Sequence, residues 1–360
     1  MEQIKVELGC DSYLIHVGSG SLARLSGLKD GMRLSAAALL ITDETVGSLY
    51  GAQVMEILLQ AGFHTEIKEI VPGEASKSLA VAEELYTKAI TMGLDRFSPI
   101  VALGGGVVGD LAGFVAATYL RGVPLIQIPT SLLAQVDSSV GGKVAVNHLL
   151  GKNLIGAFYQ PRMVLIEPAM LGSLPEREFA TGLAEVIKHG LIGDRELFAD
   201  LQQNNKVIWN KDSLLLTRLI SRSCRLKAEV VRQDEREAAL RMILNFGHTI
   251  GHAVEKAANF SYSHGEAVAI GMHGAALISR DYGLCSQQTV DQVCDILSKY
   301  CLPLKVRGCT VPQLESYLMR DKKTINGQIN WVLLTDIGSA VVRNDVPRFI
   351  VRKALSQITV

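Results

Sequence analysis

The sequence predicts an α/β domain built on a mainly parallel sheet, followed by a mostly helical domain. Two observations support this prediction. Before about residue 168 short apolar runs alternate with helical patterns, whereas after Glu167-Pro168 long helical patterns dominate. Strands that are buried on both faces appear as continuous apolar runs, and strands that alternate with helices form parallel sheets. We therefore divide the chain into domains at residues 1–168 and 169–360.

In the first domain, strands and helices are expected to alternate. Each expected strand is a short apolar run that ends in polar or turn-forming residues, and each expected helix has apolar residues at helical spacing. The expected strands are 38–43, 65–71, 99–103 and 124–129, and the expected helices are 54–59, 78–92 and 111–119.

The second domain is expected to be helical apart from one β-like segment. The expected helices are 176–191, 213–232, 238–258, 265–282 and 289–300, and the β-like segment is 329–334. Active sites of such proteins lie at the carboxyl ends of parallel strands and at domain interfaces. We therefore expect the active site between the two domains.

Composition excludes several classes of protein. The 360 residues are 48% apolar and 20% charged, which excludes a disordered chain. Lys plus Arg number 36 and Asp plus Glu number 36, so the chain lacks the basic excess of a general nucleic-acid binder. The longest uncharged stretch, 122–136, is interrupted by Pro124 and is too short to span a membrane. The start has no secretory signal and the six cysteines form no C-x-x-C pair, so we expect a cytoplasmic enzyme.

A glycine motif, Gly104-x-Gly106-x-x-Gly109, follows an expected strand and opens an expected helix. Glycines allow backbone N–H groups and a helix N-terminus to approach a pyrophosphate, as in Rossmann-like domains. The motif lies late in the chain, and no acidic residue follows at the usual spacing to hold a ribose. A glycine turn that only packs a helix on a strand is the alternative. If a dinucleotide binds, Asp43 and the loop 72–77 are the candidates for holding its ribose.

Histidines cluster in a way that suggests a metal site. His248 and His252 are four residues apart and share one helix face. His264 follows shortly afterwards, and Glu185 lies on an earlier expected helix. A catalytic Zn²⁺ takes three N or O ligands and keeps one position open. Spacing alone favours His248 with His252 and does not decide which carboxylate completes the set.

Two loop segments suit a phosphorylated ligand. The segments 137–143 and 151–153 follow an expected buried strand and combine small residues with two lysines and an amide. Lys188, Lys227 and Arg241 lie on helices that carry or flank the metal candidates. Each alone is typical of a solvated surface charge, but they occur together with carboxylates and imidazoles.

Together these motifs resemble the 3-dehydroquinate synthase family of sugar-phosphate cyclases. The resemblance covers nearly the whole chain, and its most specific segments are 104–110, 129–143, 245–253 and 264–272. It implies Zn²⁺, with Co²⁺ as an alternative, held by Glu185, His248 and His264. It implies His252 as a nearby proton-handling residue, which replaces the pairing that spacing alone favoured.

The resemblance also implies bound NAD. Asp43 would hold the adenosine ribose, although its neighbour Thr45 departs from the Asn of some relatives. The implied contacts are Asp43, Pro72, Gly73, Glu74, Ala75, Ser76, Lys77, Gly106, Val107, Val108, Gly109, Asp110, Thr130, Ser131, Lys143, Lys152, Met170, Leu171, Gly172 and Ser173.

The family reaction converts 3-deoxy-D-arabino-heptulosonate 7-phosphate, a phosphorylated sugar acid, to 3-dehydroquinate and phosphate. The steps are transient oxidation, phosphate elimination, re-reduction, ring opening and aldol closure, within the shikimate pathway of aromatic amino acid synthesis. The implied substrate residues are Arg121, Asp137, Asn153, Lys188, Lys227, Arg241, Asn245 and either Lys322 or Lys323.

Three alternatives and one expectation about assembly remain. The alternatives are a related sugar-phosphate cyclase, a metal-dependent alcohol dehydrogenase of the glycerol dehydrogenase type, and a non-catalytic nucleotide- or metal-binding regulator. The family implies a homodimer, in which Arg121 would be supplied to the partner's site.

Overall fold

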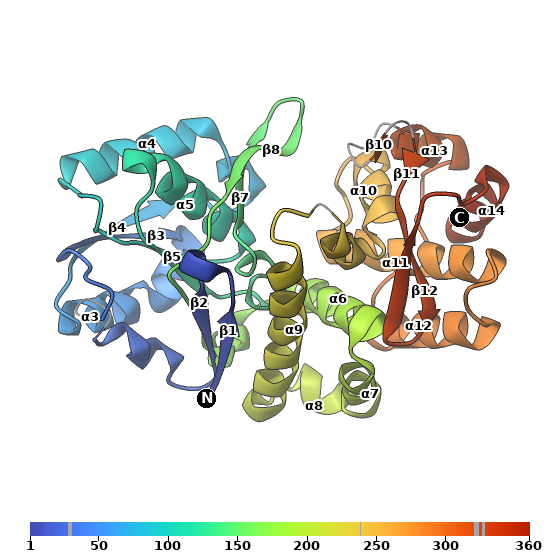
Figure 1. Cartoon of the computed structure of the whole chain (residues 1–360), viewed down its shortest axis with the longest axis horizontal. Coiled ribbons are helices and arrows are strands. Elements are labelled where there is room, and N and C mark those ends of the chain that lie inside the picture. Colours follow the sequence, from blue (N-terminus) through green and yellow to red (C-terminus); the bar gives the residue numbers. More distant parts are fainter. Residues whose placement is uncertain (28–30, 238, 320–323, 326–327) are drawn as a thin grey trace. The chain divides into compact units, whose positions relative to one another are not determined.

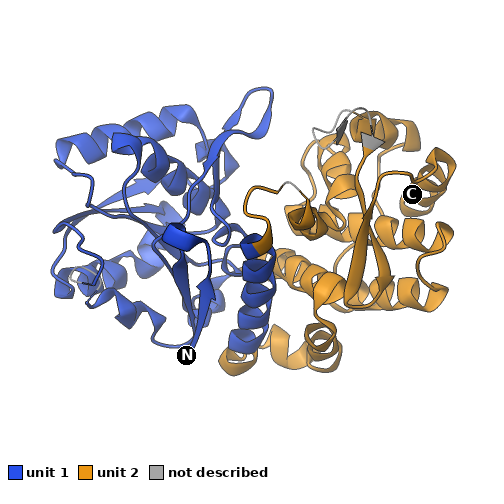
Figure 2. Cartoon of the chain, viewed as in Figure 1, with its two compact units in different colours: residues 1–174, 216–232 blue, residues 175–215, 233–360 orange. Residues whose placement is uncertain are grey.

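The structure, a computed structural model, describes residues 1–27, 31–237, 239–319, 324–325 and 328–360. The chain forms two compact units (Figure 2). Unit 1 comprises residues 1–174 and 216–232, and unit 2 comprises residues 175–215 and 233–360. The units differ from the division expected at residue 168 because residues 169–174 and 216–232 belong to unit 1.

Unit 1 contains a seven-stranded sheet with the order β1-β2-β9-β6-β5-β3-β4 (Figure 1). Neighbouring strands run parallel except β1 and β2, which pair antiparallel at one edge. The strands are Glu2–Val6 (β1), Tyr13–Val17 (β2), Ala37–Asp43 (β3), His64–Ile70 (β4), Ile100–Gly104 (β5), Leu125–Pro129 (β6) and Met163–Ile166 (β9).

Helices cover both faces of this sheet. Apolar side chains of α4 (Leu79–Thr91) and α5 (Gly106–Thr118) pack with one face, and those of α3 (Ala52–Gln60) pack with the other. The central strands β5 and β6 are buried along their whole length. Burying one such aliphatic side chain contributes about 1.5–3 kcal/mol to folding, so continuous apolar runs favour the middle of the sheet.

The carboxyl ends of the central strands lie level with one another. Thr42 pairs with Leu103, Gly104 pairs with Pro129, and Thr130 N donates to Gly104 O at 3.0 Å. The loops that follow β3, β5 and β6 therefore meet at one edge of the sheet, where ligands of parallel α/β sheets bind. A short helix, α2 (Glu44–Val46), follows β3 at this edge.

An antiparallel hairpin extends from unit 1 (Figure 1). It consists of β7 (Lys143–His148) and β8 (Gly151–Phe158). The long helix α9 (Ser213–Gln233) contributes its residues 216–232 to the same unit.

Unit 2 is mostly helical, and α11 is buried over almost its whole length, with α6, α10, α12, α14 and β12 packed around it. This confirms the predicted fold class. The helices are Glu176–Gly193 (α6), Arg195–Gln203 (α7), Asn205–Trp209 (α8), His248–Ala257 (α10), His264–Asp281 (α11), Gln287–Lys299 (α12), Val311–Met319 (α13) and Arg348–Ile358 (α14). The strands are Thr324–Ile325 (β10), Gln328–Ile329 (β11), Trp331–Asp336 (β12) and Ser339–Arg343 (β13).

One expected helix is wrong. The segment 238–258 contains a short 3-10 turn, Leu240–Asn245, and then the separate helix α10. The break falls at Gly247, whose φ of 78° is left-handed, a conformation that glycine adopts without strain. A Cβ at this position would also lie 2.6 Å from Met272 Cγ. Packing against α11 therefore overrides the helical pattern of the sequence.

Within the described ranges, every helix is too short or too polar to cross a lipid bilayer.

Candidate active site

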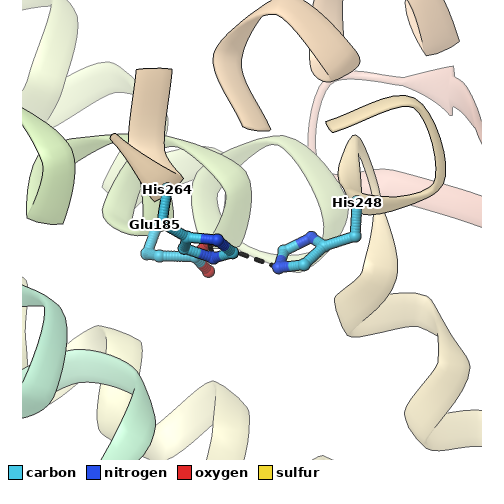
Figure 3. A group of neighbouring side chains, drawn as sticks. All are labelled: Glu185, His248 and His264. Atoms are coloured by element: carbon cyan, nitrogen blue, oxygen red, sulfur yellow. Dashed lines mark ion pairs between the residues drawn. The ribbon is translucent and has the colours of Figure 1, made fainter. Parts of the chain in front are cut away.

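Three side chains of unit 2 converge as a metal site would require (Figure 3). Glu185 lies on α6, while His248 and His264 are the first residues of α10 and α11. Glu185 Oε1 lies 3.5 Å from His248 Nε2 and 3.6 Å from His264 Nε2. Ligands about 2.0–2.2 Å from a tetrahedral Zn²⁺ are separated by about 3.3–3.6 Å, so the spacing fits one shared cation.

Local structure explains how each donor reaches this position. Glu185 is fully buried near the middle of α6. The left-handed Gly247 ends the preceding turn and makes His248 the first residue of α10. Ser263 caps α11 in a reciprocal capping box with Glu266, which sets the start of the helix at His264.

Hydrogen bonds orient both imidazole rings. His248 Nδ1 lies 3.2 Å from Phe246 O, and His264 Nδ1 lies 3.3 Å from Glu255 Oε1. When Nδ1 donates its proton to an oxygen, Nε2 carries the lone pair that a metal needs. In both histidines this Nε2 faces Glu185 Oε1.

The charges of the cluster are strongly coupled. Burial disfavours a charge on Glu185, but Lys188, with which it forms a buried ion pair, and the two imidazoles lower its pKa well below the usual range. Burial and Lys188 lower the pKa of His248 well below its ordinary value. Burial also opposes a charge on His264, but Glu185 and Glu255 outweigh it and raise the pKa of His264 to about 10. A divalent cation would therefore compete with a proton for His264 Nε2.

The donor set therefore fits a divalent cation such as Zn²⁺ or Co²⁺. Glu185 Oε1 is buried and has no hydrogen-bond partner of ordinary length among the described residues, as expected of a ligand oxygen. His252 lies beside the cluster, with its ring 5.5 Å from His248 and 6.3 Å from His264 between centroids. Among the described residues His252 belongs to a second possible three-donor group, with Glu255 and His264, whereas no such group contains both His248 and His252.

The glycine motif of unit 1 lies at the carboxyl edge of the sheet. Gly105 is the N-cap of α5, and Gly106 is its first residue, earlier than the expected start at 111. A Cβ on Gly105 would lie 3.4 Å from Ser131 Oγ, and one on Gly106 would lie 3.2 Å from Ser138 Oγ. The motif therefore brings backbone N–H groups of a helix N-terminus close to the residues that follow β6.

Asp43 and Lys77 each have partners within unit 1. Asp43 Oδ1 accepts hydrogen bonds from the backbone N–H groups of Thr45 and Val46 and so caps α2. Lys77 is 4% exposed; its ammonium forms an ion pair with Asp110 and donates to Asn153 Oδ1 at 2.5 Å. Burial raises the pKa of Asp110, against the lowering effect of Lys77. Lys77 therefore links the loop after β4 to α5 and to the hairpin.

The other residues predicted to contact NAD also belong to unit 1. Lys143 and Lys152 are exposed on the hairpin. Met170 and Ser173 lie in a 3-10 turn, Pro168–Ser173, where Tyr50 donates to Met170 O at 3.0 Å. The structure thus gathers the predicted cofactor residues in one unit and the predicted metal ligands in the other.

The predicted substrate residues divide between the units. Arg121, Asp137, Asn153 and Lys227 belong to unit 1, where Lys227 Nζ lies 2.5 Å from Asp137 Oδ1. Lys188, Arg241, Asn245 and His252 belong to unit 2. Arg241 is 2% exposed and donates to Glu235 O, and Asn245 Nδ2 donates to Glu237 Oε1 at 2.7 Å. Lys322 and Lys323 lie outside the described residues.

Sequence reasoning missed Glu255 and Asn147. Glu255 follows His248 and His252 at helical spacing on the same face of α10, so the pattern could have revealed it. Asn147 lies at an irregularity in the pairing of β7 with β8, for which the sequence has no local signal.

The solved structures most informative about class are two cyclases. The chain is similar to 2-epi-5-epi-valiolone synthase from Streptomyces hygroscopicus subsp. jinggangensis with NAD⁺ and Zn²⁺ bound, with a TM-score of 0.89, 30% identity, and coverage of 99% of this chain and 98% of that chain. It is also similar to 2-deoxy-scyllo-inosose synthase complexed with carbaglucose-6-phosphate, NAD⁺ and Co²⁺, with a TM-score of 0.84, 27% identity, and coverage of 99% and 100%. The fold and the donor cluster together define a member of the sugar-phosphate cyclase class.

Sequence comparisons identify the family within that class. The N-terminal model of 3-dehydroquinate synthase matches residues 67–181, and the C-terminal model matches residues 182–324. The 3-dehydroquinate synthase of Desulforamulus reducens is 48% identical over 99% of this chain and 100% of its own length. That of Pelotomaculum thermopropionicum is 48% identical over 99% of this chain and 96% of its own length. The chain belongs to the 3-dehydroquinate synthase family.

A more distant likeness extends to dehydrogenases. A probable glycerol dehydrogenase from Sinorhizobium meliloti has a TM-score of 0.66 at 15% identity, with coverage of 96% of this chain and 95% of that chain. At this identity the likeness shows a shared fold alone.

Proposed function

We propose that the chain is an NAD- and Zn²⁺-dependent 3-dehydroquinate synthase. It would convert 3-deoxy-D-arabino-heptulosonate 7-phosphate to 3-dehydroquinate and phosphate, as a carbon–oxygen lyase that closes a ring. The observation that carries the proposal is the convergence of Glu185, His248 and His264 in a chain 48% identical, over 99% of its length, to a protein of that name.

Glu185, His248 and His264 would hold the metal ion. When bound, Zn²⁺ would polarise a substrate hydroxyl and lower its pKa. Lys188 holds Glu185 ionised through a buried ion pair, and Glu255 holds the His264 ring with Nε2 available. This chain's contribution to the metal is therefore a set of donors held in place by their neighbours.

Residues of unit 1 would hold NAD, which supplies reversible hydride transfer when bound. Backbone N–H groups of Gly106–Asp110 at the start of α5 would face the pyrophosphate. Asp43 would hold the adenosine ribose, and Glu74 and Lys77 would bind from the loop after β4. Thr130 and Ser131, the exposed lysines 143 and 152, and the turn 170–173 would complete the contacts.

The remaining polar residues would bind and orient the sugar acid. Lys143, Asn153 and a lysine at 322 or 323 would bind the phosphate, with Arg121 supplied by the partner of a homodimer. Arg241 would bind the carboxylate, because a planar guanidinium donates hydrogen bonds to both carboxylate oxygens.

Binding the ring hydroxyls requires both hydrogen-bond donors and hydrogen-bond acceptors. Asp137, Lys188, Lys227 and Asn245 would orient the hydroxyls. His252, beside the metal donors, would move a proton between a hydroxyl and solvent.

The alternatives account for fewer residues. A related cyclase with another substrate would not need Arg241, Lys227 and Asn245 together as a carboxylate-binding set. An alcohol dehydrogenase of the glycerol dehydrogenase type would not need Lys143 and Lys152, and would release its reduced cofactor. A non-catalytic regulator would not need the complete set of donor and substrate residues.

We further propose that the protein acts in the cytoplasm as a homodimer on a small molecule, without binding nucleic acid or membranes. Its balanced charge, 36 basic against 36 acidic residues, supports the absence of nucleic-acid binding.

The direct test is an assay of purified protein with the heptulosonate phosphate. We expect phosphate release with catalytic NAD⁺, no net NADH, and complete loss after treatment with a chelator. Net NADH formation would instead support a dehydrogenase. Turnover unaffected by the Arg241→Ala substitution would support a related cyclase with another substrate.

A further inference from the structure

Asn147 lies where the β7–β8 hairpin departs from regular pairing. Val146 pairs with Ile155, but His148 pairs with Gly151, so the register shifts across Asn147. Asn147 alone on β7 opposes residues 152–154 of β8, so the extra residues of this bulge lie on β8. Asn147 N donates out of the hairpin to Lys77 O at 2.8 Å.

The side-chain amide of Asn147 forms hydrogen bonds through both its nitrogen and its oxygen. Its Nδ2 donates to Glu74 Oε1 at 2.6 Å, and its Oδ1 accepts from Asn153 N at 2.9 Å. With the backbone bond to Lys77, three hydrogen bonds connect this residue to two separate segments of unit 1. Its neighbours at the tip, Leu149 and Leu150, are almost fully exposed and give the hairpin little packing.

Asn153, whose backbone N–H donates to Asn147, has an unusual backbone conformation. Asn153 has a φ of 54°, in the left-handed region, which asparagine adopts more readily than most residues but still at a cost. In this conformation Asn153 Oδ1 accepts from Lys77 Nζ, and Lys77 is paired with Asp110. The bond from Asn153 N to Asn147 Oδ1 therefore stabilises one end of a chain of contacts that reaches α5.

We propose that Asn147 is a positioning residue that holds Asn153 and Lys77 in the conformations that bind phosphate and dinucleotide. The inference rests on the proposed function, in which Glu74 and Lys77 contact NAD while Lys152 and Asn153 border the substrate phosphate. The side-chain amide of Asn147 would thus link the ordering of the β7–β8 hairpin to the binding of both the substrate phosphate and NAD. Asn147 itself touches neither ligand in this account.

The test combines four variants with one control. Asn147→Ala removes both side-chain hydrogen bonds. Asn147→Asp keeps the acceptor for Asn153 N but places a carboxylate next to that of Glu74. Adding Glu74→Gln to Asn147→Asp restores a hydrogen bond with its direction reversed, and Glu74→Gln alone is the reference for this double variant. The control is Asn344→Ala, an exposed asparagine that follows β13.

The measurements are NADH affinity by fluorescence, steady-state kinetics with the heptulosonate phosphate, and amide exchange of residues 151–158. For Asn147→Ala we expect KM for the phosphate substrate and Kd for NADH to rise about tenfold each, since two hydrogen bonds are lost. We expect kcat to stay near the wild-type value, because the variant loses interactions that bind the ground state and the transition state equally. We also expect amide exchange in the hairpin to accelerate. Asn147→Asp should weaken NADH binding less in the Glu74→Gln background than alone.

Several results would overturn the inference. One is unchanged KM and Kd in Asn147→Ala. Another is a fall in kcat with a lower melting temperature and unchanged KM, which would indicate a merely structural role. An equal effect of Asn147→Asp in both backgrounds would also contradict it. A wild-type protein that does not turn over the substrate would instead refute the proposed function, and NADH affinity with amide exchange would still decide the role of Asn147.

Discussion

The two units hold their charged residues in different ways. In unit 2 the donor cluster is built on helices, and both Glu185 and Lys188 are almost completely buried. In unit 1 several residues predicted to hold ligands are exposed on a loop and a hairpin, namely Glu74, Lys152 and Asn153, although Lys77 and Lys227 are buried. A buried charge must be fixed by its partners before any ligand arrives, whereas an exposed one can adapt. The metal donors are therefore preorganised by packing, and the ligand loops by hydrogen bonds.

The test with the largest expected effect removes one donor from the donor cluster of unit 2. His248→Ala should lower phosphate release by about a hundredfold or more, because losing a ligand both weakens metal binding and displaces the remaining donors. The measurement is turnover together with bound metal by elemental analysis. His64→Ala, an exposed histidine on β4, is the control. Near-normal turnover with metal retained would refute the role of His248.

A second test disturbs the packing that preorganises the donors. A Cβ on Gly271 of α11 would lie 1.9 Å from Gly247 O and 2.8 Å from Gly251 N, so α10 and α11 would have to separate. Gly271→Ala should reduce the free energy of unfolding by about 2–3 kcal/mol through overpacking. Gly31→Ala, where a Cβ would meet nothing within 4 Å, is the control for calorimetric melting. Equal melting temperatures would show that close helix packing is unimportant.

A third test concerns the orientation of one imidazole. Glu255→Gln keeps an acceptor near His264 Nδ1 but removes the charge, and Glu255→Ala removes both. Affinity for Zn²⁺, measured by competition with a chromophoric chelator, should fall about tenfold or more for Glu255→Ala and less for Glu255→Gln. Glu178→Gln, an exposed carboxylate earlier on α6, should bind Zn²⁺ as the wild type does. Unchanged affinity in both Glu255 variants would exclude this role.

The smallest expected effect separates folding from ligand binding in unit 1. Asp43→Ala should cost about 1 kcal/mol of stability, because Asp43 caps α2. Asp43→Asn should keep the cap, since asparagine caps as well as aspartate, but weaken NAD binding through loss of the carboxylate. The measurements are melting temperature and NADH affinity. A normal NADH affinity in Asp43→Asn would remove Asp43 from the ribose site.

The parallel sheet was predictable because its central strands are short continuous apolar runs, a pattern that each strand shows by itself. The buried runs that became β3, β5 and β6 are apolar over their whole length, and only the interior of a covered sheet accommodates such runs. Helices α6, α11 and α12 of unit 2 were predicted with errors of a few residues at their ends, whereas α7, α8, α13 and α14 were not predicted. The break at Gly247 was not predictable, because it depends on contact with Met272, which is distant in sequence.

The candidate site was only partly predictable. Periodicity placed His248 and His252 on one helix face, yet Glu185 and His264 come from other helices and no spacing rule relates them. The family resemblance supplied that set, and the structure brings its three members together. Glu255 had a helical spacing that could have revealed it. Asn147 depends on a shift in strand register, which no short-range pattern encodes.

The central claim is that Glu185, His248 and His264 hold a single cation. It is tested most directly by calorimetric titration of metal-free protein with Zn²⁺, compared with the triple variant in which all three residues are alanine. The account predicts one tight equivalent per chain in the wild type and none in the variant. Tight stoichiometric binding that persists in the triple variant would contradict it.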